Sequence, residues 1–190
     1  MNDRVQAIGN PLPFWIPLFR DFYFRRSLLY DLSSIASTLQ YHVYNTTPAS
    51  LIMFSVYILT YNEEIDIAAC IESAQMSDDI IVIDSYSSDR TMEIASRYPV
   101  RVMQHAFETH GKQRTWMLQE VPTKYDWVYI LEADERFTPE LFSECLNAIK
   151  SQEFIGYYVA ERVMFMDRWI RFSTQYPRCQ MRLFRKDRVW

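Results

Sequence analysis

The sequence predicts an α/β protein in which helices flank both faces of a mainly parallel sheet. From Leu51 onward, apolar runs of strand length alternate with amphipathic stretches of helical length, which is the pattern of βαβ units. The run LIMFSVYIL (51–59) is continuously apolar, as a strand buried on both faces should be. Polar residues follow the strongest strands directly, at the edge where such sheets bind ligands.

Each predicted element carries its own signal. After the first strand, Asn62 is the predicted N-cap of a helix, with Glu63 and Glu64 in the first turn, where the helix dipole favours acids. The run DIIVID (79–84) is the second strand.

Caps and prolines mark the later helices. The helix at 90–98 ends before Pro99, and we expect Asp89 to cap its start rather than to act in catalysis. Thr138 is likewise a predicted cap, with Pro139 at the first helical position. The remaining elements are strands at 100–105, 126–133, 156–166 and 180–185, and helices at 112–121 and 140–150.

The composition is that of an ordinary globular protein. The 190 residues suffice for one domain with an appendage, and the net charge of −4 with 49% apolar residues excludes disorder and broad non-specific nucleic-acid binding. Three glycines are too few for a glycine-rich phosphate loop. The three cysteines lack paired spacing, which excludes a zinc or disulfide framework and favours a reducing cytosol. Neither a signal peptide nor a membrane-spanning run is present.

Residues 1–50 differ from the rest, and we expect them to form an aromatic-rich N-terminal extension to the α/β domain at 51–190. The segment PLPFWIPLFRDFYFRR (11–26) combines aromatics, prolines and arginines. It fits either an interfacial segment on a membrane or an extra layer packed on the core, and helical apolar stripes are more commonly core. The stretch from Arg168 onward holds seven basic residues and one acid, Asp187. This excess of positive charge suits a phosphate-bearing partner.

Three polar clusters should meet at one edge of the sheet. They are Thr60 to Glu63, Asp84 to Asp89, and Glu132 to Asp134. In the last of them, acids gather at the end of a buried strand, where they repel one another unless a cation lies between them. Residues two apart on a strand project to the same side, so Glu132 and Asp134 are expected to face one metal ion.

Several ordered segments resemble the family 2 glycosyltransferases, which have the GT-A fold of nucleotide-diphospho-sugar transferases. They are FSVYILTYNEE, DIIVIDSYSSDRT, KQR and YILEADERFTPEL, and YPRCQMRLFRK further resembles the branch of lipopolysaccharide core β-glucosyltransferases. The resemblance covers residues 53–188. It implies a GT-A domain over 51–190 with a shortened C-terminal, acceptor-binding part.

The resemblance also implies that a nucleotide-diphosphate sugar, most simply a UDP-sugar, lies across the strand ends. Tyr61 would stack against the base, Asn62 and Glu63 would line the ribose, and Thr60 belongs to the same cluster. The donor-binding residues that it implies are Thr60, Tyr61, Asn62, Glu63, Asp84 and Arg114. Of these, Asp84 would accept a hydrogen bond from the base, and Arg114, with Lys112 as a second candidate, would add positive charge near the phosphates.

Glu132 and Asp134 stand where the family has its Asp-x-Asp motif, and they are the implied catalytic and metal-binding residues. Mg²⁺ or Mn²⁺ would bridge Asp134 and the two phosphates and neutralise charge on the leaving diphosphate. Glu132 replaces the usual aspartate, and we expect metal binding through Asp134 to survive this change. Tyr86 stands where relatives have glycine, and since a bulky residue disfavours positive φ, we expect that turn to take another shape.

The catalytic base stays unassigned. Relatives supply a carboxylate downstream of the Arg-Leu-Phe-Arg stretch, and this chain ends at Trp190, so Glu135 and Glu161 are the candidates that the chain offers. The expected function is an inverting, metal-dependent sugar transfer to a glycan or lipid-linked acceptor, in lipopolysaccharide or polysaccharide biosynthesis of the cell envelope.

Two alternatives remain. The first is a truncated or non-catalytic nucleotide-sugar-binding module that lacks the base. The second, ranked behind it, is a nucleotidyltransferase, although TYNEEID lacks the glycine-rich loop of that class. The expected place is the cytoplasm, or the inner face of the cytoplasmic membrane reached through residues 1–50 or the basic C-terminal stretch. Nucleic acid is not an expected partner.

Overall fold

The structure is a computed structural model that describes residues 5–8, 53–150, 154–166, 168–172 and 176–188. The aromatic-rich segment at 11–26 lies outside the described residues, so its two interpretations stay predictions. Four residues of the predicted extension are described, as strand β1 (Val5–Ile8), which pairs in parallel with β6 (Gly156–Glu161).

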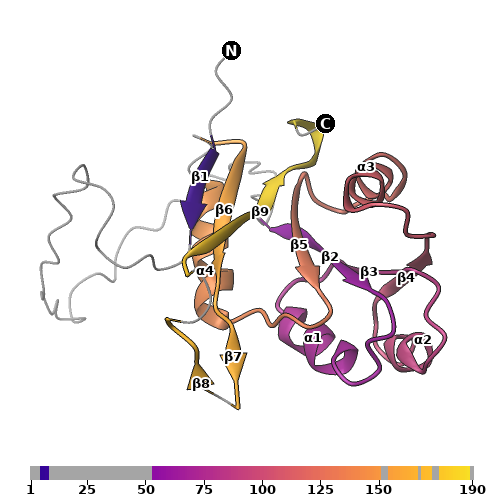
Figure 1. The fold of residues 1–190 in the computed structure, drawn as a ribbon. Coiled ribbons are helices and arrows are strands. Elements are labelled where there is room, and N and C mark those ends of the chain that lie inside the picture. The colour runs from indigo at the N-terminus through magenta and orange to yellow at the C-terminus, as the bar shows by residue number, and fades with distance from the viewer. Residues whose placement is uncertain (1–4, 9–52, 151–153, 167, 173–175, 189–190) are drawn as a thin grey trace, which may run out of the picture. The chain divides into compact units, whose positions relative to one another are not determined.

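The described residues form a seven-stranded sheet in the order β1-β6-β9-β5-β2-β3-β4. The other strands of this sheet are β2 (Phe54–Thr60), β3 (Ile80–Asp84), β4 (Arg101–Gln104), β5 (Trp127–Glu132) and β9 (Arg178–Arg185). Neighbours run parallel except around β9, which is antiparallel to both β5 and β6. A separate hairpin joins β7 (Met164–Phe165) to β8 (Arg168–Trp169), as Figure 1 shows.

Helices cover both faces of the sheet because successive side chains of each strand point to opposite sides. On one face, Val56, Ile58 and Leu131 pack with buried residues of α1 (Ile67–Ala74), α2 (Thr91–Ala95) and α4 (Pro139–Lys150). On the other face, Tyr57, Ile81 and Ile130 pack against α3 (His110–Glu120), through Met117. A short 3-10 helix, η1 (Lys186–Arg188), follows β9.

The predicted fold class is confirmed, but some element boundaries are wrong, and one of them is the helix predicted at 90–98, which spans Thr91–Ala95. The first helix begins at Ile67 rather than near Asn62, and the predicted strand at 156–166 is divided into β6 and β7. The predicted cap Thr138 holds, since its Oγ1 accepts from the Leu141 N–H at 3.2 Å. The predicted cap Asp89 is wrong, because the N-cap of α2 is Arg90, and Asp89 precedes it and accepts from the Thr91 N–H at 2.9 Å. Among the described helices, none has the length and apolar character needed to cross a membrane.

Candidate active site at the carboxyl ends of the strands

The structure brings the three predicted polar clusters to one edge of the sheet, here called the carboxyl edge. In the parallel register, Thr60 lies opposite Asp84 and Leu59 opposite Glu132. Backbone hydrogen bonds continue this pairing past the strand ends, from the Ser85 N–H to the Thr60 carbonyl at 2.9 Å and from the Ala133 N–H to the Leu59 carbonyl at 3.0 Å. Neighbouring strand ends thus hold the three clusters in fixed register.

The loop after β2 is bonded to the loop after β3, and this explains why Asn62 does not cap a helix. Asn62 has a φ of 54°, in the left-handed region that asparagine tolerates better than most residues. Its backbone N–H donates to Ser87 Oγ at 2.8 Å, and its side-chain oxygen accepts from the Ser88 N–H at 2.8 Å. The side-chain oxygen that a cap requires is therefore used to join two loops.

Glu63 and Glu64, which were predicted to lie in a first helical turn, also bond to the segment that follows β3. The Glu63 N–H donates to Thr91 Oγ1 at 2.8 Å, and the Glu64 N–H donates to Asp89 Oδ2 at 3.0 Å. Burial and the nearby carboxylate of Asp134 raise the pKa of Glu63. Carboxylates of the first and third polar clusters therefore influence each other electrostatically.

Asp84 is fully buried and organises the turn that follows β3. Its carboxylate accepts from the Ser87 N–H at 3.0 Å, from Gln104 Nε2 at 3.0 Å and from the Ser87 hydroxyl. The expectation that Tyr86 would avoid positive φ is wrong, because its φ is 60°. The three bonds to Asp84 hold the turn closely enough to maintain a conformation that glycine would take without cost.

Two exposed tyrosines lie in the hydrogen-bonded loops that follow β2 and β3. Tyr61 is 60% exposed and Tyr86 is 59% exposed. Tyr61 was predicted to stack against a base, and its exposure leaves a ring face free for that contact. Tyr86 was not predicted as a site residue, because the sequence signal at its position was only the missing glycine.

Two buried polar atoms near the carboxyl edge have no hydrogen-bond partner among the described residues. They are Thr60 Oγ1, at the end of β2, and Arg114 Nε, in the first turns of α3, the helix that follows β4. Buried polar atoms are almost always satisfied, so each such atom calls for an explanation. Both belong to residues that were predicted to bind the donor, and a bound phosphate or ribose hydroxyl would satisfy them.

The positive group between the acids at the end of β5 is a side chain of the protein. Arg182 on β9 is 1% exposed, and its guanidinium binds Glu132 Oε1 at 3.1 Å, Glu135 Oε1 at 2.5 Å and Glu161 Oε1 at 2.8 Å. We call these four residues the Arg182 cluster. Gathered acids were expected to need a cation, and for two of the three acids at 132–135 that cation is arginine.

Asp134 is the acid that the Arg182 cluster leaves out. The expectation that Glu132 and Asp134 project together from a strand is wrong, because β5 ends at Glu132 and the next residues form a turn closed by the Glu135 N–H to the Glu132 carbonyl at 2.9 Å. Asp134 is exposed and forms no hydrogen bond or ion pair with another described residue.

This arrangement fits a divalent ion that has one carboxylate of the protein as its ligand. Within the described ranges no group of three or more His, Cys, Asp or Glu side chains is placed to hold a metal. Mg²⁺ is commonly bound through one or two carboxylates together with substrate phosphates, so a dedicated cage is not required. Asp134 has a free carboxylate for this purpose, and Glu132 has one oxygen engaged by Arg182.

Residues 55–188 match the family model described as glycosyl transferase family 2. The chain belongs to this family. The sequence resemblance and the GT-A fold class are thereby confirmed, because the match spans the strands β2, β3 and β5 whose ends form the carboxyl edge.

Two curated relatives of this glycosyltransferase family 2 chain illustrate the match. The lipopolysaccharide core biosynthesis glycosyltransferase LpsC of Rhizobium meliloti (strain 1021) is 29% identical over 142 residues, which cover 70% of this chain and 51% of LpsC. An uncharacterized glycosyltransferase of Rickettsia bellii (strain RML369-C) is 30% identical over 137 residues, covering 70% of this chain and 46% of that protein. The chain spans about half the length of the curated relatives that it matches.

Solved structures give weaker similarities. Residues 1–349 of S. aureus TarS share 20% identity with a TM-score of 0.47, covering 70% of this chain and 47% of that one. Glucosyl-3-phosphoglycerate synthase from Mycobacterium tuberculosis, in complex with uridine-diphosphate, shares 25% identity with a TM-score of 0.39, covering 44% and 34%. At these TM-scores the similarity says nothing about the ligands of this glycosyltransferase family 2 chain.

Neither candidate base is free in the described structure. Both carboxylate oxygens of Glu135 already accept hydrogen bonds, Oε1 from Arg182 and Oε2 from the Glu132 N–H at 3.0 Å. Burial raises the pKa of Glu135 to about 7, although Arg182 opposes this shift. Glu161 Oε1 also binds Arg182. Both residues therefore serve the Arg182 cluster, and the base stays unassigned.

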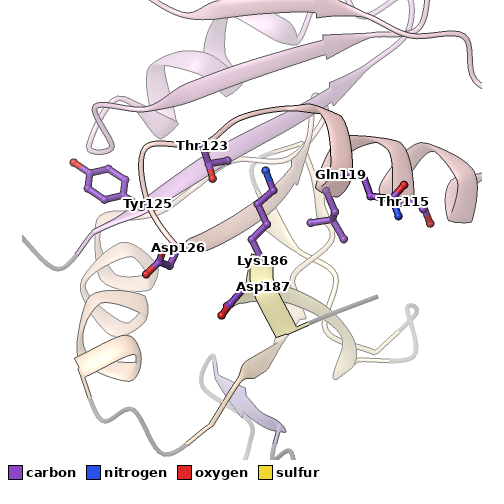
Figure 2. A pocket seen from close by; sticks show the side chains of 8 residues that line it. Thr115, Gln119, Thr123, Tyr125, Asp126, Lys186 and Asp187 are labelled. Atoms are coloured by element: carbon purple, nitrogen blue, oxygen red, sulfur yellow. The ribbon is translucent and has the colours of Figure 1, made fainter.

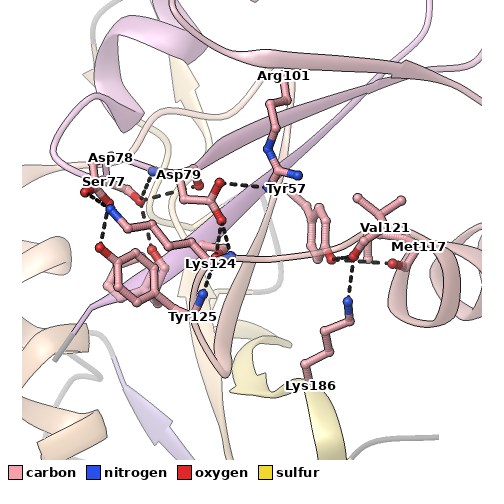
Figure 3. Close-up of polar contacts among 12 residues, drawn as sticks. Tyr57, Ser77, Asp78, Asp79, Arg101, Met117, Val121, Lys124, Tyr125 and Lys186 are labelled. Carbon is pink, nitrogen blue, oxygen red and sulfur yellow. Dashed lines mark hydrogen bonds and ion pairs between the residues drawn. The ribbon is translucent and has the colours of Figure 1, made fainter. Parts of the chain in front are cut away.

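A pocket of about 380 Å³ lies at the opposite end of the strands, here called the amino edge. Figure 2 shows side chains from α3, from the loop before β5 and from η1 around it, and none of the predicted site residues lines it. Its lining residues are Thr115, Leu118, Gln119, Thr123, Tyr125, Asp126, Lys186 and Asp187. Next to it, a polar network joins Asp79 to the loop before β5, as Figure 3 shows.

Proposed function

We propose that this chain binds a nucleotide-diphosphate sugar across the carboxyl edge and transfers the sugar to a glycan or lipid-linked acceptor, as the donor-binding part of a glycosyltransferase. One observation carries the proposal: three separate polar clusters meet at the edge where parallel sheets bind ligands, and polar groups there lack protein partners. Membership of glycosyl transferase family 2 gives the class of reaction.

The donor half of the site follows from the geometry of the two joined loops. The exposed ring of Tyr61 would stack on the base, which we take to be uracil, and the Tyr86 ring is available beside it. Asp84 keeps a lone pair on Oδ1 for one more donor, but the residue is fully buried, so a hydrogen bond to the base would require the turn at Ser87 to move. Asn62 and Glu63 would then lie along the ribose, held by their bonds to Ser87, Ser88 and Thr91.

The phosphate half would be bound by Asp134 through Mg²⁺ or Mn²⁺, with Arg114 as a protein cation. Such an ion supplies Lewis-acid stabilisation of the charge that grows on the leaving diphosphate. Within the chain, the Arg182 cluster holds the Glu132–Glu135 turn and leaves the exposed Asp134 out of its neighbours' ion pairs. Glu132 then contributes as a positioning group, with its second oxygen available to a water or ribose contact.

The transfer would proceed with inversion, with the acceptor oxygen attacking the anomeric carbon from the side opposite the diphosphate. The relative LpsC, named for lipopolysaccharide core biosynthesis, supports an acceptor of the cell envelope. We accordingly place the reaction in the cytoplasm or at the inner face of the cytoplasmic membrane. A carboxylate outside the described residues would supply the base.

Calorimetry with UDP and Mn²⁺ tests the donor site, and labelled nucleotide sugars test turnover. We expect UDP binding that requires the metal, together with transfer or slow hydrolysis of one donor sugar. The Asp134→Asn variant should lose the metal-dependent part of binding, while Asp187→Asn at the amino edge, an equally conservative change at an exposed acid, should not. Absence of UDP binding by the intact protein would refute the proposal.

A non-catalytic nucleotide-sugar module is the second candidate, favoured by the engagement of Glu135 and Glu161 with Arg182. It predicts the same metal-dependent UDP binding with no hydrolysis or transfer of any sugar in a donor panel. The two candidates are thus separated by turnover and not by binding.

A further inference from the structure

The β7–β8 hairpin, defined here as residues 162–166 and 168–172, presents a contiguous group of exposed apolar side chains. These are Val163 at 46% exposure, Met164 at 55%, Phe165 at 64%, Met166 at 82% and Phe172 at 94%. Single exposed apolar residues are ordinary, but a contiguous group on one element marks an interaction surface. In Figure 1 the hairpin projects beyond the end of β6, away from the central sheet.

The apolar side chains lie on both faces of the hairpin. Phe165 pairs with Arg168 and Met164 pairs with Trp169, and residues opposite each other share a face while successive residues alternate. The register is fixed by the Ile170 N–H, which donates to the Val163 carbonyl at 3.0 Å. A flat protein partner would cover one face of such a hairpin, whereas the headgroup layer of a membrane can surround both.

Three arginines accompany the apolar side chains. Arg162 and Arg171 lie over the Trp169 ring, at 5.1 and 5.5 Å from its centroid, and Arg168 is exposed on the other face. None of the three forms an ion pair with an acid of the described ranges. Asp167 is the one acid that the sequence places between residues 162 and 172, so this stretch has a net positive charge.

We propose that the β7–β8 hairpin inserts its apolar tip into the headgroup layer of an anionic membrane, where its arginines bind lipid phosphates. The combination of apolar side chains with arginines is typical of segments that lie at the interface of anionic bilayers. A glycan fits less well, because small-ligand sites are concave and carry placed hydrogen-bonding groups, whereas the most exposed side chains of this hairpin are thioether and phenyl groups. The inference concerns where the protein works and does not depend on donor chemistry.

Co-sedimentation with vesicles tests the proposal on the full chain. Vesicles of phosphatidylcholine with phosphatidylglycerol should bind the protein more tightly than vesicles of phosphatidylcholine alone. The combined Arg162→Gln, Arg168→Gln and Arg171→Gln variant should weaken partitioning by about fivefold for each arginine removed. The combined Phe165→Ser and Met166→Ser variant should weaken it on the order of tenfold.

Matched controls separate the hairpin from general charge and hydrophobicity. Arg90→Gln, Arg97→Gln and Lys150→Gln remove three exposed cations outside the hairpin and the basic C-terminal stretch, and Phe107→Ser removes a half-exposed phenyl ring. These variants should bind vesicles as the wild type does. Residues 1–50 are present in every variant, so their contribution is common to all. Hairpin variants that bind as tightly as the controls would overturn the proposal.

A fluorescent label distinguishes insertion from adsorption by charge alone. An environment-sensitive dye attached through Met166→Cys, in a Cys179→Ser background that removes the exposed thiol, should shift to the blue on anionic vesicles. The same dye attached through Ile65→Cys, another highly exposed position, should not shift. Loss of binding in the arginine variant without a dye shift at position 166 would overturn insertion.

UDP calorimetry on the same variants keeps this inference separate from the proposed function. The hairpin variants should bind UDP and Mn²⁺ as the wild type does. Vesicle binding without UDP binding would support the hairpin inference and refute the proposed function, and UDP binding without hairpin-dependent vesicle binding would do the reverse.

Discussion

An aspartate directly precedes strand β3 and another ends it, and the two carboxylates are used differently. At the amino edge, Asp79 accepts from Ser55 Oγ at 2.5 Å, from Arg101 at 2.8 Å and from the Lys124 N–H at 2.8 Å (Figure 3). At the carboxyl edge, Asp84 is held by its own turn, while Thr60 Oγ1 beside it has no described partner.

The difference shows how to tell a structural acid from a site acid. At the amino edge each polar group in the Asp79 network bonds to another part of the chain, and the network joins β2, β3, β4 and the loop before β5. At the carboxyl edge the loops are fixed equally well, but Tyr61, Tyr86 and Asp134 remain exposed. A pocket alone would have pointed to the amino edge instead of the proposed site, because the pocket of about 380 Å³ lies beside the Asp79 network.

The Arg182 cluster is the part of the carboxyl edge that should behave like the amino edge. Replacing Arg182 by Met leaves three carboxylates without their cation, and we expect the free energy of unfolding to fall by about 3–5 kcal/mol. Urea denaturation measures this change. Arg182→Lys should recover only part of it, because an ammonium cannot match the geometry of the guanidinium toward three acids. Unchanged stability in both variants would show that the cluster is not structural.

Asp134 should show the opposite behaviour. Asp134→Asn is expected to lower sugar transfer or donor hydrolysis by roughly 100- to 1,000-fold, as removal of a group that stabilises transition-state charge does. Its stability in urea should match that of the wild type, because the side chain is exposed and has no described partner. Asp187→Asn serves as the control for activity. Equal loss of activity in both variants would remove the distinction between the two edges.

Asp79 provides the reciprocal test at the amino edge. Asp79→Ala leaves the Ser55 hydroxyl and the Lys124 N–H without their acceptor and removes the ion pair with Arg101, so we expect a loss of about 2–3 kcal/mol in stability. The folded fraction should bind UDP with unchanged affinity, as measured by calorimetry below the unfolding transition. Weakened UDP binding at unchanged stability would place Asp79 in the site.

Thiol labelling tests whether the packed core next to the carboxyl edge opens to solvent. We expect little labelling of the buried thiols. Burial raises the pKa of Cys70 to about 12 and also raises the pKa of Cys145, so both thiols stay protonated at pH 8. Exposed Cys179 should react rapidly with a disulfide reagent, and the two buried thiols should react only on unfolding. Rapid reaction of Cys70, which lies against the Glu132 carbonyl at 3.5 Å, would show that the edge opens.

Several features of the site followed from the sequence because they depend on local rules. Continuous apolar runs predicted the parallel strands, and the ends of those strands predicted which polar clusters meet. The capping role of Thr138 also held, since a cap bonds to backbone only two or three residues away. The start of α1 was wrong because Asn62 bonds to Ser88, which lies 26 residues further along the chain.

The sequence by itself determined the family, the fold class and the edge of the sheet that carries the polar clusters, because apolar periodicity and strand polarity are properties of neighbouring residues. Only the tertiary structure decided how the acids at 132–135 are divided. Glu132 and Glu135 meet Arg182, 50 and 47 residues away along the chain, while Asp134 remains free. Charges act through space, so the partner of a carboxylate is fixed by which strand lies beside it, here the antiparallel β9.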